Sequence, residues 1–534
     1  MKFSATQIPY HSTGLFSKLV NDYIEARPSA LAFANYAPNL EGVAKAIEQR
    51  KNFPIDRKVL VSVLKEQYSN VAAIEAVNAN VALLGAENTF VVTTAHQPNI
   101  FTGPLYFFYK IIHAIELAAD LKKQFPQNNF VPVYYMGSED ADIDEVGSFY
   151  LDGAKHQWIT KQTGAIGRMK VDDALLGLIK NIEGFWSVKK QGGEALESLK
   201  NAYSKGATIN QATLSLVHAY FGKYGLVVLQ PDDVKLKAQF IPVMEKELLL
   251  QFSQKALQPT ITKLAASYHV QTEGRLLNLF YLKDNLRARI ELVNNTYKIV
   301  DTDLEFTQAE IIAELHAHPD RFSPNVILRG VYQETILPGV VFIGGGGELA
   351  YWLELKNVFD EVGVHYPVLQ LRNSFLFIKE KLWEQWTALG FNHTDIFKPL
   401  LELEVKLVNS HAKENISLIQ FKEKLAELYI HIQAEVVKVD PTLGEHTLNL
   451  SVQSNKKLVE LEKKMLKAEK RKQATNIERV HKIKKELFFQ GSIQERVDNF
   501  AQWVGEFGWA WVDAILTNSN TMEQGFTIIT IQKE

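Results

Sequence analysis

The chain contains no cysteine among its 534 residues. Disulfide bonds, thiolate nucleophiles and cysteine-ligated zinc are therefore excluded together. No stretch approaches the roughly 18 consecutive apolar residues that a membrane-spanning helix requires. The first residues also lack the apolar core of a secretory leader. We therefore expect a cytoplasmic protein that has no membrane partner.

A strong charge of either sign is also missing, since the formal net charge is −3. A near-neutral balance gives no reason to expect a nucleic-acid partner. Lysine and arginine do gather in residues 463–485, but glutamates are interspersed among them. Such a mixture is typical of the solvated face of a coiled coil. A chain of this length exceeds one hydrophobic core, so we expect two or three domains.

Short apolar segments that are followed by helical segments predict an α/β fold, a Rossmann-type doubly wound parallel sheet. The predicted strands are 90–92, 131–136, 224–230, 339–343 and 365–371. Two connecting insertions interrupt this pattern, at about 150–222 and 255–325. The first begins with a predicted β-hairpin within residues 150–171, and the second contains a hairpin whose turn is 283–285. We assign residues 1–380 to the Rossmann-type core with its insertions.

Residues 381–487 are predicted to form a helical domain with a long antiparallel coiled-coil hairpin. Apolar residues at heptad spacing form a seam that runs through Leu418, Phe421, Leu425, Leu428 and Ile432. Residues 440–444 break the helix, and a second helix is expected over about 446–486, with a length of roughly 60 Å. Because both feet of a hairpin lie together, residues 488–534 are expected to return to the core.

Polar side chains follow the first predicted strand, where open α/β sheets bind ligands. His96 and Gln97 come directly after the strand, and a helix is expected to start at Thr102 and Gly103. Backbone N–H groups at a helix start favour a phosphate or carboxylate. The alternative is that His96 and Asn99 only order the turn.

The second predicted strand ends in an acidic cluster that includes Glu139, Asp140 and Asp142. Because the cluster follows an apolar strand, part of it must lie at the edge of the sheet. These carboxylates could hold Mg²⁺ on a nucleotide, bind a substrate ammonium or act as a general base. The spacing matches no EF-hand, so we assign no residue to a metal site of the protein.

Glycines and arginines supply further candidates for binding. Gly345, Gly346 and Gly347 precede Glu348, but no acidic residue follows at the spacing that NAD recognition requires. The glycines would bring the backbone close to a phosphate or adenine, or form only a tight turn.

Four arginines are candidate clamps for carboxylates or phosphates, namely Arg287, Arg289, Arg329 and Arg372. Arg329 follows an apolar run and must be paired, with Glu334 as a candidate structural partner. Gln494 and Arg496 lie in a Gly-Ser loop that would close over a nucleotide or serve only as a return loop.

Four long blocks in order identify a resemblance that covers nearly the whole chain. They are TTAHQPNIFTGPLYFFYKIIHAIELA, VPVYYMGSEDADIDEV, SPNVILRGVYQETILPGVVFIGGGGELAYW and QERVDNF. The sequence resembles the bacterial family of bacillithiol biosynthesis cysteine-adding enzymes. Many relatives read Gly-Gln-Gln where this chain has Ala95-His96-Gln97.

The resemblance implies a ligase that joins cysteine to glucosaminyl-malate in the last step of bacillithiol biosynthesis. It also implies a Rossmann-type core, two connecting insertions and a homodimer through the coiled coil. The core looks like that of class I aminoacyl-tRNA synthetases, although the HIGH and KMSKS signatures are not present. Residues 344–349 similarly resemble a glycine-rich loop of cysteinyl-tRNA synthetases.

The mechanistic hypothesis is that ATP, with Mg²⁺ as a further candidate, activates the cysteine carboxylate before the glucosamine amine attacks. His96 and the Thr102–Gly103 helix start would hold phosphates, and Asp140 or Glu139 would bind an ammonium or accept a proton. Arg329 and Arg372 would clamp the malate carboxylates. The alternatives are another class I synthetase-like nucleotidyltransferase and a non-catalytic coiled-coil scaffold that binds nucleic acid.

Overall fold

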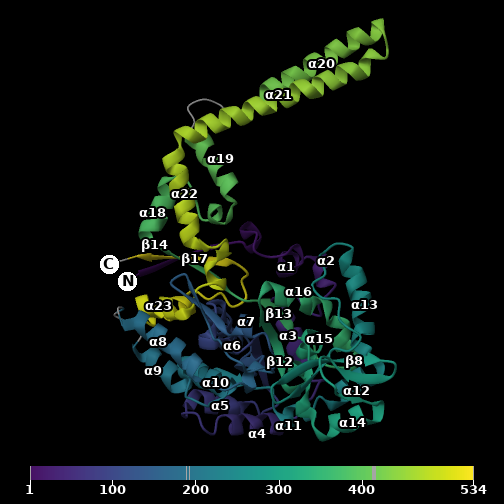
Figure 1. Cartoon of the computed structure of the whole chain (residues 1–534), viewed down its shortest axis with the longest axis vertical. Helices are drawn as coiled ribbons and strands as arrows, with labels where there is room; N and C mark the ends of the chain where they lie inside the picture. The colour runs from purple at the N-terminus through teal and green to yellow at the C-terminus, as the bar shows by residue number, and fades with distance from the viewer. Residues whose placement is uncertain (1, 188, 190, 192, 412–416, 533–534) are drawn as a thin grey trace. The chain divides into compact units, whose positions relative to one another are not determined.

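The computed structural model describes residues 2–187, 189, 191, 193–411 and 417–532. The chain folds into two compact units. Unit 2 consists of Gln7–Leu376 and Gln494–Thr527, and unit 1 consists of the described residues within Met1–Thr6, Phe377–Ile493 and Ile528–Glu534 (Figure 1). The chain crosses between the units within β1 (Lys2–Ile8), β14 (Ser374–Lys379) and β17 (Phe526–Gln532), strands that form a sheet in the order β1-β17-β14.

Unit 2 is built on a five-stranded parallel sheet, which confirms the doubly wound prediction. Its order is β13-β12-β2-β3-β6. The strands are β2 (Thr89–His96), β3 (Asn129–Met136), β6 (Val227–Leu229), β12 (Gly339–Gly344) and β13 (Val368–Leu371). Their residues are almost all buried, as expected for a sheet that is covered on both faces. The direction of strand addition reverses between β2 and β12, so this is the topological switch point.

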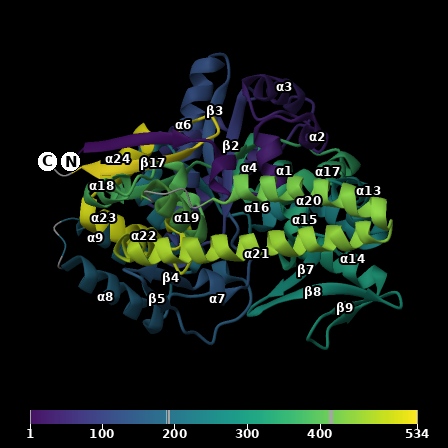
Figure 2. The same ribbon diagram turned by 90° about the horizontal axis from the view of Figure 1, so that it is seen from above.

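Helices on the sheet supply the core of unit 2. The helix α6 (Tyr106–Gln124) connects β2 to β3, and α3 (Leu40–Arg50) packs into the same apolar cluster (Figures 1 and 2). That cluster joins Val43, Val92, Leu117 and Val341. The other N-terminal helices are α1 (Lys18–Ile24), α2 (Pro28–Leu31), α4 (Arg57–Gln67) and α5 (Glu75–Leu83).

The two interruptions of the sheet contain the predicted hairpins. The segment between β3 and β6 contains α7 (Ile143–Val146), β4 (Ser148–Leu151), β5 (Ala154–Gln157), α8 (Asp173–Ser187), α9 (Gly193–Ala202) and α10 (Ile209–Phe221). Asp233 caps the helix after β6, as its position predicts, because its side chain accepts from the N–H groups of Lys235 and Leu236.

The sequence between β6 and β12 forms another sheet of five strands, which is antiparallel and has the order β10-β9-β8-β7-β11. Its strands are β7 (Leu279–Lys283), β8 (Leu286–Val293), β9 (Thr296–Ile299), β10 (Glu305–Phe306) and β11 (Phe322–Pro324). The helices of this region are α11 (Val234–Ala238), α12 (Ile241–Leu250), α13 (Phe252–Ala265), α14 (Gln308–Ala317) and α15 (Val326–Ile336). The turn between β7 and β8 is where the sequence predicts it.

The remaining helices of unit 2 flank the last strands. They are α16 (Gly346–Glu354), α17 (Lys356–Val362), α23 (Phe500–Phe507) and α24 (Ala510–Thr517). Helix α23 packs on α6, since the ring of Phe500 stacks on Phe108 at 5.2 Å between centroids. Residues 494–527 thus form part of the same unit as the sheet.

Unit 1 contains the predicted antiparallel hairpin. Helices α20 (Ile419–Val439) and α21 (Leu443–Lys472) lie side by side in both views (Figures 1 and 2). Asp440 orders the break between them, since its Oδ1 accepts from the Thr442 N–H at 2.8 Å. The unit also contains α18 (Glu380–Ala388), α19 (Leu400–His411), α22 (Ala474–Leu487), β15 (Phe488–Phe489) and β16 (Ser492–Ile493).

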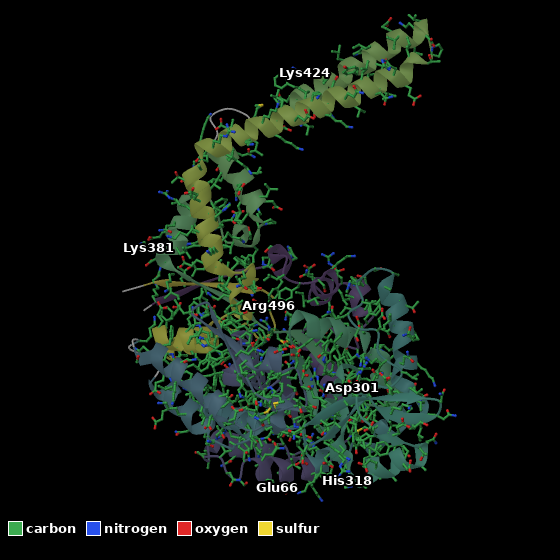
Figure 3. The ribbon with its side chains drawn as sticks, viewed as in Figure 1. Glu66, Asp301, His318, Lys381, Lys424 and Arg496 are labelled. Atoms are coloured by element: carbon green, nitrogen blue, oxygen red, sulfur yellow. The ribbon has the colours of Figure 1, made fainter. Side chains whose placement is uncertain are left out.

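The predicted hairpin seam is right at Leu418 and Leu425, which are partly buried, and wrong at the exposed Phe421, Leu428 and Ile432. Phe421 and Leu428 are exposed, by 63% and 53%. The face of α20 that contacts α21 instead includes Lys422, which pairs with Glu462, and Tyr429, whose hydroxyl lies 2.7 Å from Ser454 Oγ. Polar pairs therefore share the seam with apolar side chains such as Leu425, and the outer surface that carries Lys424 is exposed (Figure 3).

The single helix expected over 446–486 is also wrong, because α21 ends at Lys472 and α22 begins at Ala474. The bend allows both helices to reach one carboxylate. Lys470 of α21 lies 2.6 Å from Glu404 of α19, and His481 of α22 lies 2.7 Å from the same side chain.

Glu334, the partner that the sequence suggested for Arg329, pairs elsewhere. Its side chain is 1% exposed, and its Oε1 accepts from Gln333 Nε2 at 2.9 Å. Arg50 donates to the backbone carbonyl of Glu334 at 3.0 Å. The other carboxylate oxygen of Glu334, Oε2, is buried and has no hydrogen-bond partner among the described residues. Burial raises the pKa of Glu334 to about 7, although Arg50 partly opposes the shift.

We predict that Glu334→Gln raises the free energy of unfolding above that of the wild type, and that this gain is larger at pH 8 than at pH 5. The folded-state pKa lies above the unfolded value of 4.5, so the wild type loses stability as pH rises through 7. Glutamine does not ionise, so the difference in free energy of unfolding between the variant and the wild type should grow by on the order of 2–3 kcal/mol from pH 5 to pH 8. Urea titrations of both proteins at pH 5 and pH 8 measure it. The exposed Glu75→Gln is the control, and a difference that does not change with pH contradicts the prediction.

Candidate active site

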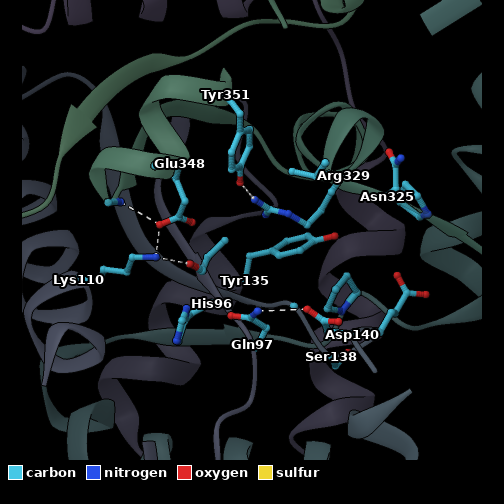
Figure 4. A pocket seen from close by; sticks show the side chains of 18 of the residues that line it. His96, Gln97, Lys110, Tyr135, Ser138, Asp140, Asn325, Arg329, Glu348 and Tyr351 are labelled. Carbon is cyan, nitrogen blue, oxygen red and sulfur yellow. Dashed lines mark hydrogen bonds and ion pairs between the residues drawn. The ribbon is translucent and has the colours of Figure 1, made fainter. Parts of the chain in front are cut away.

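A cavity of about 400 Å³ opens at the carboxyl ends of the parallel strands, next to the switch point (Figure 4). Its polar lining comes from the ends of strands, from the first turns of α6, α15 and α16, from the β7–β8 hairpin and from the segment that contains Arg496. The polar side chains are His96, Gln97, Tyr106, Lys110, Tyr135, Ser138, Glu139, Asp140, Arg287, Asn325, Arg329, Glu348, Tyr351, Arg372 and Arg496. The structure therefore brings together most of the residues that the sequence analysis selected.

His96 lies at the end of β2 as a neutral imidazole. Burial is the main cause that holds its pKa well below the usual value, and the cations Lys110, Arg372 and Arg329 lower it further. Its ring packs edge-on against Tyr106 at 5.2 Å, and Nε2 has no hydrogen-bond partner among the described residues. A neutral ring supplies a hydrogen bond to a ligand but no positive charge for a phosphate.

Asp140 and Gln97 join the ends of β3 and β2. Gln97 Nε2 donates to Asp140 Oδ2 at 3.1 Å, and Asp140 Oδ1 accepts from the Ala141 N–H at 2.7 Å (Figure 4). Arg287 Nη1 lies 3.9 Å from Asp140 Oδ1, beyond hydrogen-bond distance. Asp140 is half-buried, so the carboxylate can accept a further bond from a ligand.

Glu139 is held by a buried network of charges. Its carboxylate forms an ion pair with Lys237, whose Nζ also lies 3.1 Å from Asp232. Arg168 binds Asp232 through two hydrogen bonds, at 2.6 and 2.7 Å. Burial raises the pKa of Glu139, whereas Lys237 and Arg168 outweigh burial and lower the pKa of Asp232 to about 2. Glu139 is therefore the less exposed and more constrained of the two acidic residues.

Lys110 links the first strand to the glycine-rich loop. Its Nζ donates to the Ala95 carbonyl at 2.8 Å and pairs with Glu348 (Figure 4). Glu348 Oε2 in turn accepts from the Gly345 N–H at 2.8 Å, which satisfies the backbone donor at the start of α16. Burial lowers the pKa of Lys110, and Glu348 opposes that shift. The chain of contacts fixes the two sides of the switch point relative to each other.

Arg329 projects from α15 and binds Tyr351 of α16, not Glu334. Its Nη2 donates to the Tyr351 hydroxyl at 2.5 Å (Figure 4). Its Nη1 is buried and has no hydrogen-bond partner among the described residues. The guanidinium lies 6.0 Å from the centre of the Tyr135 ring. Arg329 therefore keeps a donor for a ligand.

Arg372 is engaged within the protein. It forms a two-point ion pair with Glu495, at 2.9 and 2.7 Å, and both side chains are buried. The clamp role predicted for Arg372 is therefore not supported by its contacts. The same pair positions the next residue, Arg496, which is exposed and lines the cavity (Figure 3).

Thr102, Gly103, Asp142 and Gln494 do not line the cavity. The helix start predicted at Thr102–Gly103 is wrong, because α6 begins at Tyr106. Thr102 has a φ of 67° in a tight turn, and the N–H groups of Thr102 and Gly103 bond to Asn99 and Ile100 carbonyls. These N–H groups are therefore not available to a phosphate.

Asp142 and Gln494 have local roles instead. The exposed Asp142 caps α7, since its Oδ1 accepts from the Glu145 N–H at 3.1 Å. Gln494 is buried in the short helical turn that also contains Arg496. Arg289, two residues from Arg287 on β8, pairs with Glu291 at 3.5 Å on the surface.

The sequence analysis missed Lys110, Tyr106, Tyr135 and Tyr351. A lysine inside the apolar run FFYKIIHAI was a detectable signal, because a buried lysine needs a partner. The tyrosines gave none, since the residues that they meet in the cavity are distant in the sequence.

Metal binding by the protein itself has no visible basis in the described part of the chain. There, no group of three or more histidine, aspartate or glutamate side chains is arranged to hold an ion. None of the described helices has the length and apolarity that a membrane span requires.

Comparisons with known proteins agree along the whole chain. Residues 1–373 match the family model "Bacillithiol biosynthesis BshC, N-terminal Rossmann-like domain", and residues 375–531 match "Bacillithiol biosynthesis BshC, C-terminal coiled-coil domain". Curated relatives carry the name "Putative cysteine ligase BshC". One from Flavobacterium johnsoniae is 38% identical and covers 98% of this chain and 99% of its own, and one from Christiangramia forsetii is 37% identical and covers 99% of each.

More distant matches have the same extent. A relative of that name from Bacillus cereus is 26% identical over 94% of this chain and 96% of its own. A solved structure titled as an arginyl-tRNA synthetase of Campylobacter jejuni is 10% identical with a TM-score of 0.19, which carries no argument for this chain.

Proposed function

The chain belongs to the BshC family of bacillithiol biosynthesis, and from that premise we propose that it is a ligase that adds L-cysteine to glucosaminyl-malate. The reaction would be the last step to bacillithiol, with ATP as the activating substrate. The observation that supports this most is the cavity at the switch point. It places carboxylates and arginine donors within one volume of about 400 Å³.

The chemistry requires activation, because a carboxylate does not acylate an amine near neutral pH. A cysteine carboxylate oxygen attacks the α-phosphorus of ATP, and pyrophosphate leaves. The glucosamine amine then attacks the carbonyl carbon of the cysteinyl adenylate. The C–N bond forms, the amine loses a proton and AMP leaves.

Asp140 is the group proposed to receive the amine. Its carboxylate is held by Gln97 at 3.1 Å and still faces the cavity. It would accept a hydrogen bond from the neutral amine of the acceptor and then take up the one proton that the nitrogen loses as the C–N bond forms. Glu139 would contribute through Lys237, which fixes the acidic end of the site.

Phosphate binding is proposed for the start of α16 in place of the Thr102–Gly103 turn. Gly346 and Gly347 line the cavity and lack side chains that would keep a phosphate away. Arg329, whose Nη1 has no hydrogen-bond partner among the described residues, would stabilise the charge that develops, since preorganised donors usually supply the largest catalytic term. His96 would bind a substrate atom as a neutral hydrogen-bonding group. Any Mg²⁺ would reach the site on the phosphates of ATP.

We expect bacillithiol to form only when ATP is present. Purified protein is incubated with cysteine and glucosaminyl-malate, with and without MgATP, and the products are measured by mass spectrometry. AMP and pyrophosphate should accumulate in equal amounts with the product. Product formation without ATP would contradict the proposed activation, and ADP in place of AMP would contradict adenylation.

Asp140→Asn is expected to lower kcat/KM by roughly 10²- to 10⁴-fold, because asparagine cannot take up the proton. Asp142→Asn is the matched control. It lies two residues away, is exposed, and retains a side chain that can cap α7. Its activity should stay within about twofold of the wild type. Equal losses in both variants would remove Asp140 from the proposed mechanism.

The homodimer through the coiled coil is the proposed assembly. Apolar side chains exposed along one face of α20, such as Phe421 and Leu428, would be covered in such a dimer. Sedimentation velocity should show a dimer for the wild type and a monomer for the double variant Phe421→Lys, Leu428→Lys. Ile159→Lys changes an exposed apolar residue of unit 2 and should leave the dimer intact. A monomeric wild type would contradict the proposal.

A further inference from the structure

The acceptor of the proposed reaction carries an amine and carboxylates in the substituents of two neighbouring sugar carbons. In a glucosaminyl glycoside the amine is on C2, and the group that the sugar carries, here malate with two carboxylates, is attached at C1. A site that recognises this molecule therefore needs a negative group for the amine beside a positive group for a carboxylate. The argument below rests on the proposed function for the identity of the acceptor.

Arg287 is the positive group that lies beside Asp140. Its Nη1 is 3.9 Å from Asp140 Oδ1, which is too long for a hydrogen bond but places the two charges side by side. The arginine side chain is 16% exposed and lines the cavity. Its Nε is buried and has no hydrogen-bond partner among the described residues. A buried guanidinium with an unused donor is poised to bind an anion.

The position of Arg287 is fixed by its own hairpin and by a second segment. Its guanidinium stacks on the ring of Phe280, at 3.8 Å from the centroid. The turn that precedes it is held by Thr163, whose Oγ1 donates to the Asn285 carbonyl at 2.7 Å. Gly164 packs against the same turn with a φ of +86°, and a Cβ there would lie 2.7 Å from the Leu286 nitrogen. The donor is therefore preorganised, which reduces the entropy lost on binding.

The other buried cations that line the cavity have different surroundings. Lys110 pairs with Glu348, and Arg372 pairs with Glu495. Arg329 bonds to Tyr351 and lies at the far side of the Tyr135 ring from the Gln97–Asp140 pair in Figure 4. Among the described residues, Arg287 is the cation that Asp140 approaches within 4 Å.

We propose that Arg287 binds a malate carboxylate of the acceptor and so determines acceptor specificity, while the adjacent Asp140 holds the C2 amine. Arg287 thereby takes the clamp role that the sequence suggested for Arg372. The β7–β8 hairpin binds the aglycone, here malate, and the ends of the parallel strands bind the reacting atoms. An acceptor without malate would lose the contact with Arg287 but keep the contact with Asp140.

Equilibrium binding tests this without turnover. Calorimetry compares glucosaminyl-malate with methyl glucosaminide, which lacks the carboxylates, on the wild type and three variants. Arg287→Gln should weaken glucosaminyl-malate binding by roughly 10- to 100-fold and leave methyl glucosaminide within about twofold. Arg287→Lys should fall between, because it retains the charge but loses the planar fork. Arg289→Gln, on the same strand and already paired with Glu291, should match the wild type.

The proposal is overturned if Arg287→Gln weakens both ligands equally or neither, or if the wild type does not prefer the malate-bearing ligand. Matching circular dichroism and melting curves exclude a folding defect. Turnover separates this result from the proposed function. A wild type that binds glucosaminyl-malate through Arg287 but forms no bacillithiol would overturn the ligase proposal alone. Bacillithiol formation with the same acceptor KM in Arg287→Gln would overturn the role of Arg287 alone.

Discussion

The buried ion pair between Arg372 and Glu495 joins the end of the last parallel strand to a segment more than a hundred residues later. Both charges are removed from water, and each makes two short hydrogen bonds to the other. Removing one partner of such a pair typically costs about 3–5 kcal/mol, because the remaining charge is left buried. The wall of the cavity that includes Arg496 depends on this pair. The return segment is thereby part of the site as well as of the fold.

The pairing of charges also separates the cations of the cavity into those that hold the structure together and those that keep a donor for a ligand. Five cations line the cavity, and two of them are neutralised within the protein, Lys110 by Glu348 and Arg372 by Glu495. Their function is to fix the strand ends and the glycine-rich loop. Arg287 and Arg329 instead keep buried donors with no protein partner. A neutral His96 between these charges is the expected consequence, since a protonated imidazole would add one more cation to a buried volume.

The parallel strands and the acidic edge could be predicted because their signals are local. Apolar runs such as residues 131–136 end in polar clusters, and the topology of a doubly wound sheet brings such ends together. The partners of the charged residues could not be predicted. Lys237 and Glu139, or Arg372 and Glu495, are about a hundred residues apart and meet only in the folded unit. The Thr102 turn misled because left-handed conformations at non-glycine residues have no clear sequence signal.

The hairpin seam failed for a related reason. Phe421 and Leu428 have the spacing of a buried seam, but the contacts with α21 are made through Lys422 and Tyr429. Spacing identifies an apolar stripe, and it does not say which surface that stripe faces. An exposed stripe at heptad spacing is itself informative, because solvent-exposed apolar residues on a long helix call for a covering surface.

The hairpin between β7 and β8 has a consequence for how this architecture could diversify. It belongs to the antiparallel sheet, and its turn is held by the Thr163–Gly164 segment rather than by the parallel strands. Changes along the hairpin would therefore leave the ends of the parallel sheet unaltered. On the proposed role of Arg287, a library that varies Phe280 and residues 284–289 is a rational starting point for engineering variants that accept acceptors with other aglycones. During evolution, substitutions in the hairpin would change which acceptor binds, while the residues at the ends of the parallel strands that form the bond stay the same.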